Sequence, residues 1–361
     1  MAVHFLTGFP GFLGAALLPR LLERSAEERV VCLVQPKFIA LARSRVEALR
    51  ATVPGAARRV RLVEGDIAGV GLGLGDPAAI AATVTEVWHL AAVYDLAVPA
   101  AVGMRVNVEG TRHVLDFAAS CPGLRRVHYV STCYVSGRFA GTFAERSLEA
   151  GQRFNNFYEE TKYLAEVEVR RRMSAGLPAT IYRPAIVVGD SRTGETQKYD
   201  GPYFIVRWLL RQPRLAVMPV VGDARRHYLN VVPRDFVVNA IAHLSRQPRS
   251  AGETYQLADP APLSVEEWLS ALATATGRRL VRVPMRRAVA KWSLAHVPGL
   301  YRLMRIPPEA VDYFEHPTRY DTAAVTRDLA GTEVEVPPAR SYIPRLVEFV
   351  RRNPRDVGVM V

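Results

Sequence analysis

The stretch that decides the fold of this chain is Thr7-Gly8-Phe9-Pro10-Gly11-Phe12-Leu13-Gly14. It follows a short apolar run at 3–6 and opens an apolar helical pattern at 15–22. Glycines at this spacing permit a tight strand-to-helix turn, let a pyrophosphate approach the main chain, and let the helix pack on the strand. The free N–H groups at the start of the helix then favour a phosphate. The stretch therefore predicts a dinucleotide-binding turn, a reading that needs partners elsewhere in the chain to be specific.

Strands and helices alternate through the first half of the sequence. We expect strands at 2–6, 29–34, 59–64, 85–90, 126–131 and 179–183, and helices at 12–24, 38–50, 101–120 and 157–175. This rhythm predicts an α/β fold, a Rossmann doubly wound parallel sheet with helices on both faces. Right-handed crossovers place the carboxyl ends of the strands along one edge. The glycine turn, Gly65–Asp66, Ala91–Ala92 and Ser131–Thr132 should therefore converge there.

The alternating rhythm breaks after residue 184. Residues 187–202 are rich in Gly, Asp, Ser and Thr and indicate a loop, and many prolines follow position 252. We expect 1–190 to form the dinucleotide-binding domain, with 226–250 returning to it. The remaining segments, 191–225 and 251–361, are then a smaller, interleaved C-terminal α/β substrate region.

Composition limits the classes of protein that this chain can be. Its three cysteines, Cys32, Cys121 and Cys133, have no paired spacing, which favours a reducing compartment. The eight histidines form no ligand pattern, so we expect no metal site. No basic leader precedes the glycine turn and no window of about 18 uncharged apolar residues occurs, so we expect a cytoplasmic protein. The net charge of +12 favours acidic partners or describes a solvated basic surface.

A second motif, Tyr158-Glu159-Glu160-Thr161-Lys162, supplies reactive groups. Residues four apart share one face of a helix, so the phenol and the ammonium can point into one cleft. A neighbouring ammonium favours phenolate and so should lower the pKa of the tyrosine, which makes it a usable general acid or base. Such pairs are common on helices. Thr132, at a predicted strand end, and the glycine turn make this one significant.

Together these motifs resemble the extended short-chain dehydrogenase/reductase family, well over residues 3 to about 245 and loosely beyond. The resemblance implies that Tyr158 donates a proton and that Lys162 binds the nicotinamide ribose and tunes Tyr158. Thr132, or less readily Ser131, would hydrogen-bond the substrate carbonyl. It also implies a homodimer built from the helices near 101–120 and 157–175.

The resemblance further implies a set of cofactor contacts. The glycine turn would hold the pyrophosphate, Asp66-Ile67 the adenine, and Ala91-Ala92 would let the ribose lie close. Asn107 would have a structural role and support the Lys162 network, and Arg183-Pro184 would end the sixth strand beside the nicotinamide. The expected cofactor-binding residues are Thr7, Gly8, Phe9, Gly11, Phe12, Leu13, Gly14, Lys37, Arg43, Asp66, Ile67, Ala91, Ala92, Asn107, Ser131, Arg183 and Pro184.

Within that family, the stretches at 87–96, 130–137 and 182–191 look like the thioester reductase and fatty acyl reductase branch. Such enzymes reduce acyl groups on coenzyme A or a carrier protein to aldehyde, and sometimes to alcohol. A hydroxy-dehydrogenase or epimerase of a sterol-like or sugar-nucleotide substrate remains an alternative. A non-catalytic nucleotide-sensing or RNA-binding protein is another, although it has no need of the proton-transfer set and no nucleic-acid motif is evident.

The end of the second strand bears on the choice of cofactor. NAD-specific members place an acid there, where it binds both ribose hydroxyls. Here the strand ends Cys32-Leu33-Val34-Gln35-Pro36-Lys37, without a carboxylate. Lys37 and Arg43 would suit the 2′-phosphate, which favours NADP over NAD. Thioester reductases usually carry an arginine where this chain has Gln35, a departure that weakens the prediction.

A basic segment at 278–305 contains eight lysine and arginine residues and no acid. Met285, Val289 and Trp292 lie among them at helical spacing. One reading is a basic amphipathic surface that meets an acidic carrier protein, coenzyme A phosphates or the surface of a membrane. The other is a solvated helix whose apolar stripe belongs to the core. Cys133, beside Thr132, is expected to be a small buried residue.

Overall fold

The computed structural model describes residues 2–297 and 306–354. At its centre lies a seven-stranded sheet in the order β11-β7-β5-β4-β1-β2-β3, with every pair of neighbours parallel. The strands are β1 (Val3–Thr7), β2 (Arg29–Val34), β3 (Val60–Glu64), β4 (Glu86–His89), β5 (Arg126–Val130), β7 (Ala179–Pro184) and β11 (Thr254–Leu257). The predicted doubly wound α/β sheet is confirmed.

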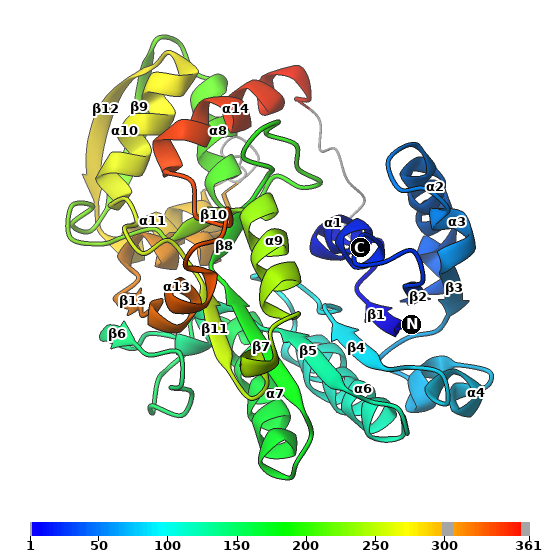
Figure 1. Ribbon diagram of the computed structural model, residues 1–361. Helices are drawn as coiled ribbons and strands as arrows, with labels where there is room; N and C mark the ends of the chain where they lie inside the picture. The colour runs from blue at the N-terminus through cyan, green and yellow to red at the C-terminus, as the bar shows by residue number, and fades with distance from the viewer. Residues whose placement is uncertain (1, 298–305, 355–361) are drawn as a thin grey trace.

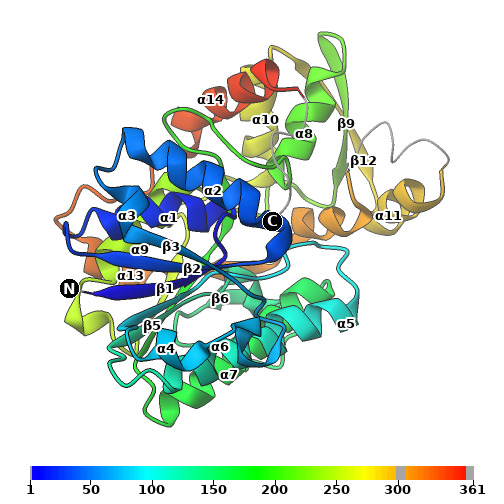
Figure 2. The same ribbon diagram turned by 90° about the vertical axis from the view of Figure 1, so that its right-hand side faces the viewer.

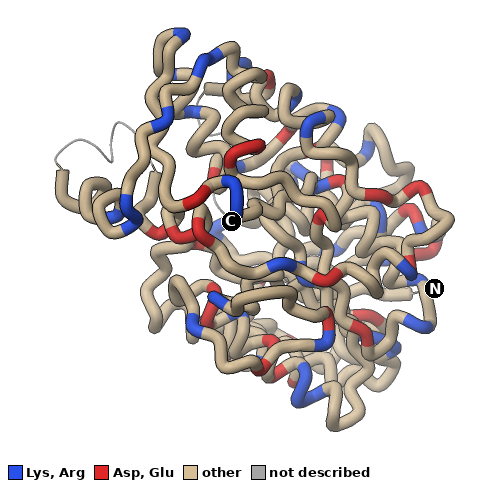
Figure 3. Tube along the Cα trace, turned by 90° about the vertical axis from the view of Figure 1, so that its left-hand side faces the viewer, with Lys and Arg blue, Asp and Glu red and all other residues tan. Residues whose placement is uncertain are grey.

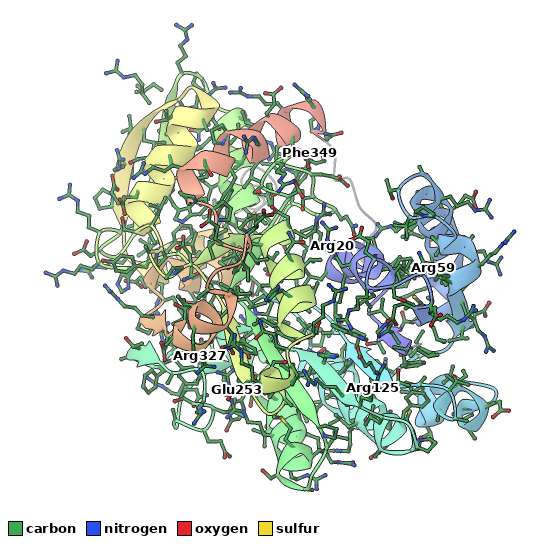
Figure 4. The ribbon with its side chains drawn as sticks, viewed as in Figure 1. Arg20, Arg59, Arg125, Glu253, Arg327 and Phe349 are labelled. Carbon is green, nitrogen blue, oxygen red and sulfur yellow. The ribbon has the colours of Figure 1, made fainter. Side chains whose placement is uncertain are left out.

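Helices cover both faces of this sheet, as Figure 2 shows. One face carries α1 (Phe12–Leu22), α2 (Ile39–Ala48), α3 (Ala56–Arg59), α9 (Arg234–Leu244) and α13 (Ala323–Leu329). The other carries α4 (Pro77–Ala81), α5 (Ala100–Gly103), the π-helical η4 (Met104–Glu109), α6 (Gly110–Ala119) and α7 (Phe157–Ser174). Each layer buries its own apolar cluster against the strands. Arg20 of α1 donates to the Asn239 side chain of α9 at 3.0 Å, which ties two helices of one layer together (Figure 4).

A smaller region lies beyond the carboxyl edge of the sheet (Figure 1). Its helices are α8 (Pro202–Leu210), α10 (Val265–Thr276), α11 (Arg287–His296) and α14 (Ala339–Arg352). Its strands β9 (Leu215–Val221) and β12 (Arg279–Met285) pair in parallel, as do β8 (Ile186–Val188) with β10 (Val231–Pro233) and β6 (Gly141–Phe143) with β13 (Thr318–Tyr320). Short 3₁₀ helices complete the description: η1 (Pro36–Phe38), η2 (Leu49–Ala51), η3 (Val70–Gly73), η5 (Cys133–Ser136), η6 (Pro248–Ser250) and η7 (Pro308–Glu315). Trp268, Tyr342 and Leu346 belong to the core of this region.

The division of the chain differs from the expected one after residue 250. β11 and α13 lie in the segment expected to bind substrate, yet β11 pairs with β7 and α13 packs on the same face as α9. Tyr255 and Leu257 are completely buried there, and Val325 and Leu329 join the same cluster. These apolar side chains bring the C-terminal half back to the sheet.

Charged positions of both signs are interspersed along the trace on the side shown in Figure 3. The residues that give the net charge of +12 therefore do not form one continuous positive patch on that side. Within the described residues, we find no helix that has both the length and the apolar character needed to cross a bilayer.

Candidate active site

The glycine turn lies at the carboxyl edge of the sheet, between β1 and α1. Gly8 adopts φ +86°, and a Cβ there would lie 2.8 Å from the main-chain nitrogen of Ala91. A Cβ on Gly11 or Gly14 would lie 2.7 or 2.5 Å from the carbonyl oxygen of Gly8. Only glycine fits these close approaches. No described side chain caps the start of α1 at Gly11, so its first N–H groups suit the pyrophosphate of a dinucleotide.

Thr7 faces the interior and not the cleft. Its hydroxyl contacts Nδ1 of His89 at 2.8 Å and accepts from the main-chain N–H of Ala91 at 3.2 Å. The other nitrogen of His89 lies 3.0 Å from the hydroxyl of Thr111, and burial lowers the pKa of this imidazole to about 3. His89 is therefore neutral and joins β1, β4 and α6 behind the turn. The side chain of Thr7 is fully buried, so only its main chain belongs to the turn that faces the cleft.

Two arginines that the sequence analysis missed lie beside the glycine turn. Arg45 of α2 donates to the carbonyl of Pro10, and Arg234 of α9 stacks its guanidinium over the Phe12 ring at 5.3 Å. Burial, and then the charge of Arg234, lower the pKa of Arg45. Both of the expected cations are exposed: Lys37 has its ammonium over the Phe38 ring, and Arg43 lies on α2.

The adenine-binding residues of the prediction follow β3. Oδ2 of Asp66 accepts from Gln35 at 2.8 Å and Oδ1 from the main-chain N–H of Ala68 at 2.9 Å. Each carboxylate oxygen has a second lone pair, so Asp66 can still accept from an exocyclic amine. Ile67 is buried against Gly110, where a Cβ would approach its Cδ1 to 2.9 Å. Gln35, which follows β2, thus orients the carboxylate of Asp66, which follows β3.

Thr132 and Tyr158 come together although 26 residues separate them. Thr132 follows β5, and its Oγ1 accepts from the N–H of Tyr134 at 3.2 Å and contacts the carbonyl of Pro184 at 3.4 Å. Tyr158 lies in the first turn of α7, where Asn156 caps the helix by accepting from the N–H of Glu159 at 3.0 Å. The Tyr158 hydroxyl lies within hydrogen-bonding reach of the Thr132 side chain. Helix cap and strand end thus fix the pair.

Lys162 does not act on Tyr158 as expected. Its Nζ donates to the phenol oxygen of Tyr129 and to the carbonyl of Val130, both at 2.9 Å. Burial lowers the pKa of Lys162 to about 7, opposed by the charge of Glu166. Burial raises the pKa of Tyr158, and the hydrogen bond to Thr132 offsets this only in part. The expected lowering of the tyrosine pKa is wrong for this structure, in which Tyr158 is a neutral phenol able to donate a proton.

Behind Thr132 lies a buried ion pair that the sequence analysis missed. Glu166 and Arg183 are both completely buried and meet at 2.5 Å. The hydroxyl of Ser131 donates to Glu166 at 2.7 Å, and Arg183 donates to the carbonyl of Ser147 at 2.7 Å. Neither Ser131 nor Arg183 therefore presents its side chain to the cleft, unlike Thr132. Sequence spacing contained a signal for Glu166, since positions 158, 162 and 166 lie on one helix face.

Asn107 has structural partners, and Lys162 is not among them. Its Oδ1 accepts from the N–H of Val93 at 2.8 Å, and its Nδ2 donates to the Thr161 hydroxyl at 3.0 Å. It therefore holds the loop after β4 against α7 and does not contact Lys162. Cys133 is buried with its thiol directed at the carbonyl of Arg183 at 3.0 Å, and burial raises the pKa of that thiol.

An apolar cavity opens beside Tyr158. The Tyr94 ring meets the Tyr158 ring edge-on at 4.9 Å between centroids, and Tyr134 contributes a further aromatic wall. The remaining lining residues are mostly aliphatic or aromatic: Leu96, Ile186, Gly201, Pro202, Phe204, Ile205, Leu229, Ile306, Ala310, Tyr313 and Phe314. Most come from α8 and η7, which the sequence could not place beside α7 because they lie far along the chain.

The basic segment at 278–305 forms β12 and α11, and its residues 298–305 lie outside the described residues. Val289 and Trp292 are 49% and 59% exposed, so these two residues of the apolar stripe are not core. Three of its cations pair with acids of the same chain: Arg282 with Glu266, and Arg287 and Lys291 with Asp312.

The fold and this site define a class, the NAD(P)-dependent oxidoreductases of the extended short-chain dehydrogenase/reductase type. The chain belongs to the male sterility protein family, whose model matches residues 6–241. This confirms the branch that the sequence motifs resemble. No group of three or more His, Cys, Asp or Glu residues within 2–297 and 306–354 could hold a metal ion.

Relatives and solved structures agree with this assignment. The chain is 30% identical to the non-canonical nonribosomal peptide synthetase FrzA of Cladobotryum sp, over 80% of this chain and 32% of that protein. It is 31% identical to a linear gramicidin synthase of Brevibacillus parabrevis, over 78% of this chain and 6% of that protein. The chain thus spans about a third or less of the length of these relatives. The terminal R domain from the myxalamid PKS-NRPS biosynthetic pathway superposes with a TM-score of 0.85, 26% identity, and 99% and 93% coverage.

Proposed function

We propose that the chain is an NADPH-dependent reductase of acyl thioesters, or of related long-chain carbonyls, that forms an aldehyde or an alcohol. The observation that carries the proposal is that Tyr158, whose pKa the Thr132 side chain influences, lines an apolar cavity. The likeness to a terminal R domain and to peptide synthetases supports a thioester as the substrate. Bound NADPH would supply the hydride.

The residues of the chain then have separate tasks. The carbonyl oxygen of the substrate accepts hydrogen bonds from Thr132 and Tyr158, which stabilise the negative charge that develops on it. Tyr158 donates its proton because burial keeps the phenol neutral. Lys162, held at Tyr129 and Val130, would bind the nicotinamide ribose. With a thioester, the resulting hemithioacetal collapses to an aldehyde and a free thiol, and the apolar walls exclude water.

Preference for NADPH is supported by charge near the end of β2. That strand ends without a carboxylate, and Gln35 is bonded to Asp66. Lys37 and Arg43 lie on η1 and α2, which follow β2, and Arg45 and Arg234 lie at the glycine turn. We expect Lys37→Ala and Arg43→Ala to raise the KM for NADPH more than that for NADH. Equal effects on both cofactors would exclude the 2′-phosphate role.

The exposed face of α11 supports an acidic carrier protein as partner. Arg286 has no acidic partner within 4 Å among the described residues and adjoins exposed Val289 and Trp292. Arg286→Glu should raise the KM for a carrier-bound substrate at low salt and leave a free small thioester unaffected. Arg226→Glu, which reverses an exposed charge outside this segment, is the control. Unchanged carrier-dependent turnover would remove the partner from the proposal.

One assay tests the function itself. Purified protein is incubated with NADPH or NADH and a panel of acyl-CoA, acyl-carrier, ketosteroid and sugar-nucleotide substrates, while absorbance and products are followed. Thioester-dependent oxidation of NADPH should disappear in Tyr158→Phe and persist in Tyr163→Phe, a phenol on the same helix that packs on Phe154. Turnover of ketones or nucleotide sugars alone would replace the proposal with a hydroxy-dehydrogenase or epimerase, and no turnover with intact nucleotide binding would indicate a sensor.

A further inference from the structure

A second cavity lies on the other side of Tyr134 from the apolar one. Tyr134 lines both cavities, and its ring packs against Tyr313, His316 and Tyr320 at 4.9, 5.0 and 6.2 Å between centroids. This aromatic cluster forms the partition between them. The other residues that line the second cavity are Thr142, Tyr228, Asn230, Asp259, Pro260, Ala261, Pro262, Thr318 and Arg319.

The second cavity differs from the first in its chemistry, because it contains polar groups with unused hydrogen-bonding capacity. His316 is only 5% exposed, its Nε2 lies 3.0 Å from the Tyr320 hydroxyl, and its Nδ1 has no partner within the described chain. Burial lowers the pKa of His316 to about 3, so the ring is neutral. A buried polar atom without a partner costs free energy unless a ligand or water satisfies it.

Asp259 faces the same space from the loop after β11. Asn230 holds this loop by a reciprocal pair of hydrogen bonds with the main chain of Asp259, both at 2.8 Å. The Asp259 carboxylate accepts from the N–H of Ala261 at 2.9 Å and has no ion-pair partner in the part of the chain that the structure describes. Burial raises its pKa. Arg319 lies on the rim, with its guanidinium over the Tyr228 ring at 4.2 Å.

A ligand for this cavity must both donate and accept hydrogen bonds. Asp259 accepts when ionised, Arg319 donates, and the free nitrogen of neutral His316 does one or the other according to its tautomer. An amide satisfies such a mixed set, since its N–H donates and its carbonyl accepts. A saturated acyl chain satisfies none of it and belongs in the apolar cavity.

We propose that the cavity bounded by His316, Asp259 and Arg319 binds an amide group of the substrate chain, one aromatic ring away from the reacting carbonyl. The proposal rests on the thioester reductase function above. Two parts of such a substrate can carry amides, the acyl group when it is peptide-like and the pantetheine arm that bears the thiol. The chemistry that the cavity recognises is the same for both.

Four matched thioesters distinguish the two sources. A decanoyl chain and an N-acylated aminoacyl chain of equal length are each joined to propanethiol, which has no amide, and to pantetheine, which has two. We expect His316→Phe and Arg319→Ala to raise the KM roughly tenfold to a hundredfold for the substrates whose amide the cavity binds. The KM for decanoyl propanethiol ester should not change. Arg226→Ala, an exposed arginine outside the cavity, is the control.

The pattern across the four substrates decides the result. An effect that follows the acyl group assigns the cavity to a peptide-like substrate, and one that follows the thiol assigns it to the pantetheine arm. Equal effects on all four substrates, or none, would overturn the proposal. Calorimetric binding of free pantetheine and of an N-acyl amino acid amide to the same variants needs no turnover. If the wild type binds a probe, the variants lose that binding and no thioester is reduced, the reductase function is overturned and the amide site stands. If the wild type binds neither probe, the amide site is overturned.

Discussion

The hydroxyl of Ser131 donates a hydrogen bond to the carboxylate of Glu166 over 2.7 Å. Its neighbour Thr132 instead faces Tyr158. We therefore expect Thr132→Ala to lower kcat by about 10²–10³-fold, because one donor to the developing oxyanion is lost. Ser131→Ala should keep kcat within a few-fold and lower the free energy of unfolding by about 1–3 kcal/mol, because it leaves a buried carboxylate short of a partner.

Steady-state kinetics and urea unfolding of both variants separate these outcomes. Thr83→Ala, which removes a hydroxyl bonded to the carbonyl of Ile80 before the amino end of β4, controls for the loss of any hydroxyl. A larger loss of kcat in Ser131→Ala than in Thr132→Ala would mean that the two roles are exchanged.

Glu166 should set the protonation of Lys162. The anion raises a lysine pKa that burial has lowered to about 7, so its removal should lower that pKa further. The pH profile of kcat/KM reports groups of the free enzyme. In Glu166→Gln, the limb assigned to Lys162 should move to lower pH by about one unit or more, whereas Glu168→Gln, which removes a carboxylate paired with Arg171, should leave it in place. An unmoved limb in Glu166→Gln would show that the ion pair with Arg183 is only structural.

The close packing of the main chain around the glycine turn can be tested by adding a Cβ at Gly8. Gly8→Ala combines a positive φ with a Cβ 2.8 Å from the main chain of Ala91, whereas a Cβ on Gly75 has nothing within 4 Å. We expect Gly8→Ala to lower the free energy of unfolding by about 1–3 kcal/mol and to weaken nucleotide binding. Gly75→Ala should change neither by more than about 0.5 kcal/mol. Chemical denaturation and nucleotide titration measure both quantities, and equal effects of the two substitutions would contradict the turn geometry.

His128 should make stability depend on pH. Burial lowers its pKa from 6.5 to about 4, and its ring stacks on Trp88 at 3.8 Å. Between these two values the unfolded chain binds a proton that the folded chain does not, so stability falls as the pH falls. This site contributes up to about 1.4 kcal/mol per pH unit. Urea midpoints of His128→Phe, which keeps the stacking, should depend less on pH between 6.5 and 4 than those of the wild type.

His4 contributes in the opposite direction and serves as the reference. Its pKa is raised in the folded protein although burial, the largest influence, opposes the rise; hydrogen bonds to Glu28 and Glu86 account for the increase. Its stabilisation is complete below 6.5 and is lost as the pH rises through the folded pKa. Loss of His4 should therefore lower stability below pH 6.5 by a constant amount, without changing the slope there, and should flatten the curve above 6.5. Identical curves for His128→Phe and the wild type below 6.5 would contradict the buried, neutral state of His128.

Local patterns were sufficient to predict the sheet and the proximity of Thr132 to Tyr158. The helix period around Tyr158 and the strand end at Thr132 are encoded by adjacent residues, and parallel topology brings strand ends to one edge. Arg45, Arg234 and the lining of the apolar cavity could not be predicted in this way, because each depends on how distant helices pack. The side-chain partners of Ser131, Asn107 and Arg183 could not be predicted for a related reason: a residue can lie beside the cleft in sequence while its side chain is bonded elsewhere.

The pKa values of the site residues also could not be predicted from residue spacing. Positions 158 and 162 share a helix face as expected, but Lys162 reaches across to β5 and contacts Tyr129. Whether a charge four residues away lowers a phenol pKa depends on where that charge points and on how much water the phenol has lost. Here the loss of water dominates, so burial determines the pKa of Tyr158.

The last strand of the sheet has a consequence for any attempt to divide this protein. β11 is supplied by residues beyond 250, and it provides every partner that the outer edge of β7 has in the sheet. A fragment that stops at the apparent end of the nucleotide-binding half would leave β7 with an open edge, a template for another chain. The segment before residue 250 and the segment beyond it are therefore obliged to fold together, and excision of either should yield aggregates instead of a folded module.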